Sequence, residues 1–230
     1  MGNKKIIITG ASRGIGFELV KLLASQDHEV LAITRDTTSL IKLQSKHKNI
    51  STLQVNISDE NEHIKVSTFI SKYWKEVDVL IHNAGKLINK TFATTSVQDF
   101  LEVYKVNVFA VAGLTNILLP FLNSGSHVLS ISSMGGIQGS LKFPGLSAYS
   151  SSKGAVITLM ELLAEEFKDA NISFNALALG AVQTEMLAEA FPNYKAPISA
   201  PEMAKYIANF ALTGNQLFNG KVLQVSSSTP

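Results

Sequence analysis

Apolar and polar positions follow two patterns along the chain, short β-branched runs and longer segments with helical spacing. The first run, Ile6-Ile7-Ile8, suits a strand buried on both faces, and residues 17–24 carry apolar side chains at the spacing of one helix face. The alternation continues to the other end of the chain. Further strands are predicted at 28–34, 50–57, 77–81, 127–132, 172–178 and 221–225, and further helices at 37–48, 59–75, 97–122, 147–168 and 201–212.

Strands that alternate with helices predict right-handed crossovers and a parallel sheet covered by helices. We therefore expect one α/β domain over residues 1–230, a doubly wound Rossmann fold whose parallel sheet has about seven strands. The long helical stretch 97–122 is expected to be interrupted near Asn107. Ligands of such sheets bind at the carboxyl ends of the strands, so functional residues are expected there.

Composition sets limits on partners and location. The chain has 230 residues, 46% of them hydrophobic, and its net charge of +2 includes no long block of like charges, so neither nucleic acid nor an acidic surface is an expected partner. It contains no cysteine, which excludes disulfides and thiolate metal sites, and no metal site is expected. We find no signal peptide and no 18-residue apolar run, so no membrane segment is expected and the cytoplasm is the expected location.

A glycine-rich loop joins the first strand to the first helix. Gly10, Gly14 and Gly16 have the spacing G-x-x-x-G-x-G. Glycine lets the backbone turn sharply and lets a ligand approach the peptide N–H groups, and the N-terminus of the next helix suits a pyrophosphate. The loop predicts a dinucleotide site; the alternative is a glycine-rich turn of some other α/β protein.

The residues after the second strand discriminate between the two nicotinamide dinucleotides. An acidic side chain there binds the ribose 2′-hydroxyl of NAD, whereas arginine suits the 2′-phosphate of NADP. Thr34 ends the strand, Arg35 follows it, and Arg13 of the glycine-rich loop is expected to approach the same phosphate. Asp36 is interpreted as a residue of the next helix's N-cap region. NADP(H) is the predicted cofactor; the alternative is that both arginines are solvated surface residues.

Small and polar residues follow the third and fourth strands. Asn56 and Ile57 come after the third strand, and Asn56 is expected to hydrogen-bond an adenine edge. The tripeptide Asn83-Ala84-Gly85 comes after the fourth strand and leaves a cofactor room beside the sheet.

Three side chains around the fifth strand are candidates for acid–base chemistry. Ser133 follows that strand, and Tyr149 and Lys153 lie on one face of the next helix, at i and i+4. An ammonium near a phenol favours the phenolate, so Lys153 is expected to lower the pKa of Tyr149 and make it useful near neutral pH. A lone Tyr-x-x-x-Lys arises by chance, but the strand-end serine and the dinucleotide loop favour function. His82 is interpreted as a packing residue.

These motifs together resemble the short-chain dehydrogenase/reductase family, over nearly the whole chain. Residues 9–16 resemble its cofactor loop, and Ser133, Tyr149 and Lys153 match its catalytic set, with Ser133 chosen over Ser132 because the family pattern is Ser-x-x-Gly. Asn107 matches the asparagine that bends the long helix and holds a water. The implied cofactor contacts are Gly10, Ser12, Arg13, Gly14, Ile15, Gly16, Thr34, Arg35, Asn56, Ile57, Asn83, Ala84, Gly85, Tyr149, Lys153, Gly180, Val182 and Thr184.

Three departures from the family pattern stand out. Asn56 stands where the family often has aspartate, and Leu179-Gly180 replaces the usual Pro-Gly pair, so a looser segment is expected there. The end of the chain, 225–230, lacks the usual Asp-Gly-Gly, which weighs against a tetramer built on the last strand. A homodimer or homotetramer is expected, in which the stretches 97–122 and 147–168 pair with their copies about a two-fold axis.

The resemblance implies an NADP(H)-dependent oxidoreductase that reduces a carbonyl or oxidises a secondary alcohol. Tyr149 would donate the proton, Ser133 would hydrogen-bond the substrate oxygen, and Lys153 would hold the ribose. The segments 137–146 and 181–197 are expected to line the substrate pocket; they are mainly apolar and lack arginine, which favours a small apolar ketone or aldehyde. Their apolar residues are equally compatible with a place in the core. Two alternatives stay open, a 3-oxoacyl reductase of fatty-acid synthesis and a non-catalytic NADP-binding regulatory protein.

Overall fold

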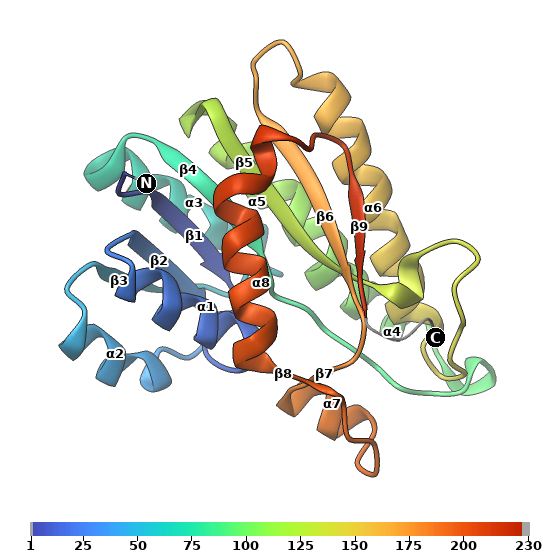
Figure 1. Ribbon diagram of the computed structural model, residues 1–230. Coiled ribbons are helices and arrows are strands. Elements are labelled where there is room, and N and C mark those ends of the chain that lie inside the picture. Colours follow the sequence, from blue (N-terminus) through green and yellow to red (C-terminus); the bar gives the residue numbers. More distant parts are fainter. Residues whose placement is uncertain (1, 227–230) are drawn as a thin grey trace.

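A seven-stranded parallel sheet runs through the computed structural model, which describes residues 2–226 (Figure 1). The strand order is β3-β2-β1-β4-β5-β6-β9, with the direction of winding reversed between β1 and β4, and this confirms the predicted fold class. The strands are β1 (Lys5–Thr9), β2 (Glu29–Thr34), β3 (Ile50–Gln54), β4 (Val77–His82), β5 (Leu122–Ser133), β6 (Ser173–Leu179) and β9 (Val222–Val225).

The sheet divides the core into two apolar layers, and helices cover each of these layers. Ile6 and Ile8 point into the layer of α1 and α8, whereas Ile7 points into the layer of α3, α5 and α6. The middle of β1, Ile6 to Ile8, is therefore apolar throughout, because both faces of the strand are covered (Figure 1). The helices are α1 (Gly14–Ser25), α2 (Ile41–Lys46), α3 (His63–Phe69), α4 (Val97–Tyr104), α5 (Ala110–Leu118), α6 (Ser147–Glu166), α7 (Glu185–Ala190) and α8 (Ala200–Thr213).

The predicted interruption of the long helix is confirmed. The π-helical turn Lys105–Phe109 separates α4 from α5 and contains the buried Asn107. A short helix and two short strands were not predicted. They are α7, β7 (Val182–Gln183) and β8 (Ile198–Ser199), and β7 and β8 pair with each other outside the main sheet.

The helical stretch Val97–Phe121 bears on the expectation that the chain has no membrane segment. Within residues 2–226 it is the one stretch long and apolar enough to cross a membrane by length and composition, although no such segment was expected. Val103, Leu114 and Leu118 of this stretch are buried in the fold, so packing accounts for much of its apolar character.

Two of the departures from the family pattern lie at the end of β6 and at the end of the chain. Leu179 lies inside β6, where it pairs with Ser133 of β5 and Val225 of β9, and the N–H of Gly180 donates to the carbonyl oxygen of Val225 at 2.9 Å. Hydrogen bonds therefore hold the end of β6 without a proline, and the looser segment expected here stays a prediction. Residues 227–230, which complete the unusual chain ending, lie outside the described residues.

Candidate active site

The glycine-rich loop packs directly on the end of β4. A Cβ at Gly10, whose φ is 68°, would lie 2.7 Å from Cα of Ala84, and a Cβ at Gly16 would lie 2.2 Å from the carbonyl oxygen of Gly10. These two positions admit only glycine, because the backbones are already in contact. The carbonyl oxygen of Ser12 accepts a 2.7 Å hydrogen bond from Ser39, which holds the outer side of the loop.

Asn83 fastens this loop to the sheet. Its Nδ2 donates to the carbonyl oxygens of Thr9 and Gly10 at 3.0 and 3.1 Å, and the backbone N–H groups of Asn83 and Ala84 donate to Oγ1 of Thr9. Asn83 and Ala84 thus help to fix the conformation of the glycine-rich loop. Thr9 was not predicted as a site residue. Its role in holding the loop depends on hydrogen bonds with the residues that follow β4, and the sequence around Thr9 does not reveal these bonds.

The loop forms a cradle that fits a dinucleotide phosphate. Gly14 begins α1 with a φ of 55°, and a Cβ there would have no atom closer than 3.5 Å, so the backbone is approachable at the N-terminus of the helix. A hollow of about 570 Å³ lies beside it and includes Ser12, Arg13 and Thr184 in its lining. Backbone N–H groups, an arginine and hydroxyls form a donor set suited to phosphate oxygens.

The residues at the end of β2 confirm the interpretation of Asp36. Its Oδ1 accepts a 2.9 Å hydrogen bond from the N–H of Thr38, and hydrogen bonding to Thr38 holds the pKa of Asp36 below its usual value. The hydroxyl of the buried Thr34 is hydrogen-bonded to the backbone of Asp36. The carboxylate therefore faces the start of the following helical turn.

The two arginines of the predicted phosphate clamp lie in separate hollows. Arg35 lines a hollow of about 250 Å³ with Asn56 and Lys65 among its neighbours. Arg13 instead meets the carboxylate of Glu189 on α7, with 2.5 Å between Nη1 and Oε1. The convergence of the two arginines on one phosphate stays a prediction, and in this structure Arg13 is paired with an acidic side chain from far along the chain.

Asn56 and Ile57 are held by local hydrogen bonds. Oδ1 of Asn56 accepts from the hydroxyl of Ser58 at 2.8 Å, and the backbone N–H of Asn56 donates to the carboxylate of Glu62 at 2.7 Å. The carbonyl oxygen of Ile57 is 2.8 Å from Nε2 of His63. These bonds fix the loop after β3, and the adenine contact of Asn56 stays a prediction.

Ser133 and Tyr149 are brought together by β5 and α6. Oγ of Ser133 accepts from the N–H of Gly135 at 3.2 Å, and the Ser133 hydroxyl is near enough to the Tyr149 phenol to lower its pKa. Ser132 is buried and donates to the carbonyl oxygen of Lys153 at 2.8 Å, so it has a structural part. The choice of Ser133 over Ser132 agrees with this geometry.

The electrostatics of Tyr149 and Lys153 differ from the expectation. Nζ of Lys153 lies 5.7 Å from the centroid of the Tyr149 ring, as the shared helix face predicts, but it donates to the carbonyl oxygen of Ile131 at 2.7 Å. Burial raises the pKa of Tyr149, and the nearby Ser133 hydroxyl offsets only part of this rise. Burial also lowers the pKa of Lys153 to about 8. The predicted lowering of the Tyr149 pKa is not found in this structure, because burial dominates and Lys153 is not among the groups that shift this pKa.

Asn107 and Lys153 converge on Gly85. A Cβ at Gly85 would lie 3.7 Å from both Oδ1 of Asn107 and Nζ of Lys153, and 3.9 Å from Cε of Met186 on α7. The Asn107 side chain accepts from the N–H of Lys86 at 2.8 Å and donates to the carbonyl oxygen of Lys86 and to the hydroxyl of Ser152. It therefore links the loop after β4 to α6, and the water predicted near it stays a prediction.

Comparison with known proteins identifies this arrangement. A model of the family described as short chain dehydrogenase matches residues 4–195. The chain belongs to the short-chain dehydrogenase family. FabG of Chlamydia trachomatis, named a 3-oxoacyl-[acyl-carrier-protein] reductase, is 27% identical over 242 residues, which are 97% of this chain and 96% of that protein.

Two further relatives show the range of the resemblance. An uncharacterized short-chain type dehydrogenase/reductase of Sinorhizobium fredii is 29% identical over 199 residues, 85% of this chain, and this chain spans only 35% of that relative's length. The solved structure titled ElxO with NADP bound has a TM-score of 0.86 and 27% identity, and the match covers 97% of each chain.

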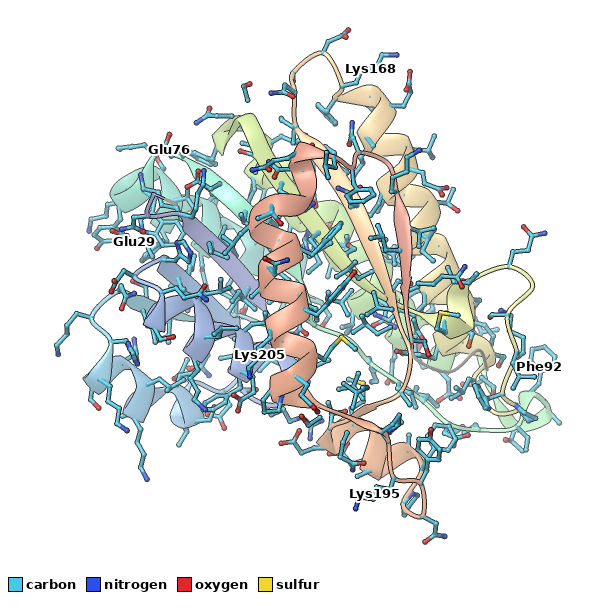
Figure 2. The ribbon with its side chains drawn as sticks, in the orientation of Figure 1. Glu29, Glu76, Phe92, Lys168, Lys195 and Lys205 are labelled. Atoms are coloured by element: carbon cyan, nitrogen blue, oxygen red, sulfur yellow. The ribbon has the colours of Figure 1, made fainter. Side chains whose placement is uncertain are left out.

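In this short-chain dehydrogenase the loop after β4 connects the two predicted pocket segments. Nδ2 of Asn89 donates to the carbonyl oxygen of Ala190 at 2.9 Å, and the N–H of Lys90 donates to the carbonyl oxygen of Gly145 at 3.0 Å. In Figure 2, Phe92 on this loop lies at the right-hand edge of the molecule and Lys195 beyond α7 lies at its lower edge. Asn89 was missed because nothing in the local sequence marks a partner so far along the chain.

Other residues named in the sequence analysis have structural roles. Val182 is buried in β7 and pairs with Ile198, and Oγ1 of Thr184 accepts from the N–H of Leu187 and caps α7. His82 lies 2.9 Å from the hydroxyl of Thr115, and burial lowers its pKa to about 3, so it stays neutral and packs as interpreted. Across residues 2–226 no three His, Cys, Asp or Glu side chains gather as a metal site.

Proposed function

We propose that this short-chain dehydrogenase is an NADP(H)-dependent oxidoreductase that reduces a carbonyl, or oxidises a secondary alcohol, on a small apolar substrate. The observation that carries the proposal is the cluster of Ser133, Tyr149, Lys153 and Asn107 beside Gly85. The cluster lies at the carboxyl ends of β4 and β5, near the end of β1 from which the phosphate cradle extends. Its acid–base groups and the cradle are both needed for such a reaction.

The protein's part in the reaction is proton transfer and orientation. A bound nicotinamide would supply hydride to the carbonyl carbon. Tyr149, whose raised pKa keeps it protonated at neutral pH, donates a proton to the carbonyl oxygen. The Ser133 hydroxyl, which lies near the Tyr149 phenol, orients that oxygen. Lys153 holds the nicotinamide ribose and, with a water at Asn107, helps to restore the proton.

The cofactor assignment rests on the two arginines and on Thr34. Arg35 lies at the end of β2, where the residue adjoining a ribose 2′ position is placed in folds of this kind, and the carboxylate of Asp36 is turned to Thr38. ElxO, which is 27% identical, was solved with NADP bound. These observations favour NADP(H) over NAD(H).

A 3-oxoacyl reductase is the second candidate, because the Chlamydia trachomatis relative carries that name. Such an enzyme would need positive charge for an acidic carrier protein. Lys86 and Lys90, on the loop after β4, are instead paired with Glu102 at 2.5 Å and with Asp99 at 2.9 Å. Neutralised lysines favour a small uncharged substrate over a carrier-bound one.

We also propose that the protein forms a homodimer, or a homotetramer built from such dimers. Apolar side chains stay exposed on α4, on the π-helical turn and on α6, with Val97 at 77%, Phe109 at 54% and Leu162 at 63%. If two copies of the protein met about a two-fold axis at these elements, each copy would cover the exposed apolar side chains of the other.

The experiment that tests the proposed function is a panel of carbonyl compounds with NADPH consumption as the readout. The panel contains aliphatic and aromatic ketones and aldehydes, a 3-oxoacyl thioester and a sugar phosphate. We expect turnover with the apolar carbonyls. Tight NADPH binding without turnover of any compound would favour a non-catalytic NADP-binding protein, and selective turnover of the thioester would favour the 3-oxoacyl reductase.

A further inference from the structure

An ion pair joins Arg13 of the glycine-rich loop to Glu189 of α7. Nη1 of Arg13 lies 2.5 Å from Oε1 of Glu189 and Nη2 lies 3.4 Å from Oε2, so both ends of the guanidinium meet the carboxylate. The hydrogen bond raises the pKa of Arg13 and lowers that of Glu189, which keeps both groups charged. Arg13 lines the hollow in which the cofactor phosphates are proposed to lie.

Helix α7 brings a second carboxylate to the same place. A Cβ at Gly14 would lie 3.5 Å from Oε2 of Glu185, and the charge of Glu185 also acts on Arg13. The Glu185 carboxylate is therefore close to the N-terminus of α1, whose unpaired N–H groups attract anions, and Glu189 holds the neighbouring Arg13. α7 presents there the same kind of charge that a dinucleotide phosphate would bring.

We infer that Glu189 is a specificity-determining residue that competes with the 2′-phosphate of NADP(H) for Arg13. The inference rests on the proposed function, because it needs Arg13 to be a contact of that phosphate. Glu189 occupies the edge of the guanidinium formed by Nη1 and Nη2, so a phosphate that binds through this edge has to displace the carboxylate. NADP(H) has to displace Glu189, whereas NAD(H), which has no 2′-phosphate, leaves the ion pair intact. Glu189 thus weakens the preference for NADP(H).

The size of the effect follows from the exposure of the pair. The side chains of Arg13 and Glu189 are 51% and 63% exposed, and exposed ion pairs are weak. Loss of the competing charge should strengthen NADPH binding about two- to fivefold. The position of α7 does not depend on Glu189 alone, because Thr184 caps the helix and Asn89 holds the carbonyl oxygen of Ala190.

The test is a direct fluorescence titration of NADPH and of NADH, which needs no turnover. The variants are Glu189→Gln, Arg13→Ala and the double variant. Glu165→Gln is the control, because Glu165 forms a comparably exposed ion pair with Lys168 on α6, away from the loop. We expect Glu189→Gln to tighten NADPH about two- to fivefold, to leave NADH unchanged, and to have no effect once Arg13 is alanine.

Each other outcome has a separate meaning. Equal changes in NADPH and NADH affinity, no change with either, or an effect that persists in the Arg13→Ala background would overturn the inference and leave the proposed function intact. A wild type that binds neither cofactor would overturn both. A wild type without preference that gains one in Glu189→Gln would support the competition and contradict the proposed NADP(H) preference.

Discussion

The ammonium nitrogen of Lys153 donates a 2.7 Å hydrogen bond to the backbone carbonyl oxygen of Ile131. This bond fastens α6 to β5 two residues before Ser133, so the strand that positions the serine also positions the lysine. The same bond directs the Lys153 ammonium to a carbonyl oxygen. Burial has the largest effect on the pKa of Tyr149 and raises it. A tyrosine with a raised pKa is protonated at neutral pH, which is the form that the proposed reduction requires.

The hydrogen bonds of Asn83 predict a loss of stability and of cofactor affinity when they are removed. Asn83→Ala should lower the free energy of unfolding by about 1–3 kcal/mol, because the carbonyl oxygens of Thr9 and Gly10 lose their donor in a part-buried place. Urea unfolding measures this loss, and NADPH titration should show weaker binding. Asn123→Ala, at an exposed hydrogen bond to Glu76, is the control. Equal stability losses in both variants would contradict the special part given to Asn83.

The buried His82 predicts a dependence of stability on acid. Its pKa in the folded protein is about 3, below the ordinary value of 6.5, so between these values the unfolded chain binds a proton that the native protein does not. Stability from this group is therefore complete above pH 6.5 and falls as the pH drops towards 3. Its share of the loss is at most about 4–5 kcal/mol. NMR titration of the imidazole should show a neutral ring at pH 5; a midpoint near 6.5 would refute the assignment.

Exposed apolar residues on α4, the π-helical turn and α6 predict an oligomer. The wild type should scatter light as a dimer or tetramer at micromolar concentration, and Leu162→Glu should shift it towards the monomer because a carboxylate would be buried in the contact. Leu217→Glu is the control, since Leu217 is 84% exposed on the turn after α8. A monomeric wild type, or equal effects of the two variants, would contradict the proposed two-fold contact.

Arg35 predicts the choice of cofactor. A charge-assisted hydrogen bond contributes about 1.5–3 kcal/mol, which is roughly ten- to a hundredfold in affinity, and solvent screening reduces it. Arg35→Ala should therefore weaken NADPH about tenfold or more and change NADH little, with the exposed Lys48→Ala as control. Titration of both cofactors measures the difference. An Arg35→Ala loss shared equally by NADPH and NADH would show that Arg35 does not contact the 2′-phosphate.

Much of the fold was predictable because local sequence patterns determine where its strands and helices form. The run Ile6-Ile7-Ile8 marks a doubly covered strand, and Asn107 breaks a long helical pattern at the point where the π-helical turn occurs. Helix α7 was missed because it has only six residues and lies in a segment whose apolar residues suggested a pocket wall.

The site was predictable in its residues and less so in its electrostatics. Ser133, Tyr149 and Lys153 come together because the i, i+4 spacing and the strand end fix their positions. The sequence does not reveal burial, which sets the pKa of Tyr149, nor contacts between distant segments. The ion pair of Arg13 with Glu189 is such a contact, and no local pattern near Arg13 announces it.

The measurement that tests the central claim most directly compares the wild type with Tyr149→Phe on a carbonyl that the wild type reduces with NADPH. Removal of the hydroxyl should lower kcat about a hundredfold or more, because the proton donor is lost, and should leave the Kd for NADPH nearly unchanged. Tyr206→Phe, at a 41% exposed position on α8, should retain full turnover. A Tyr149→Phe variant that keeps most of its turnover would contradict the account.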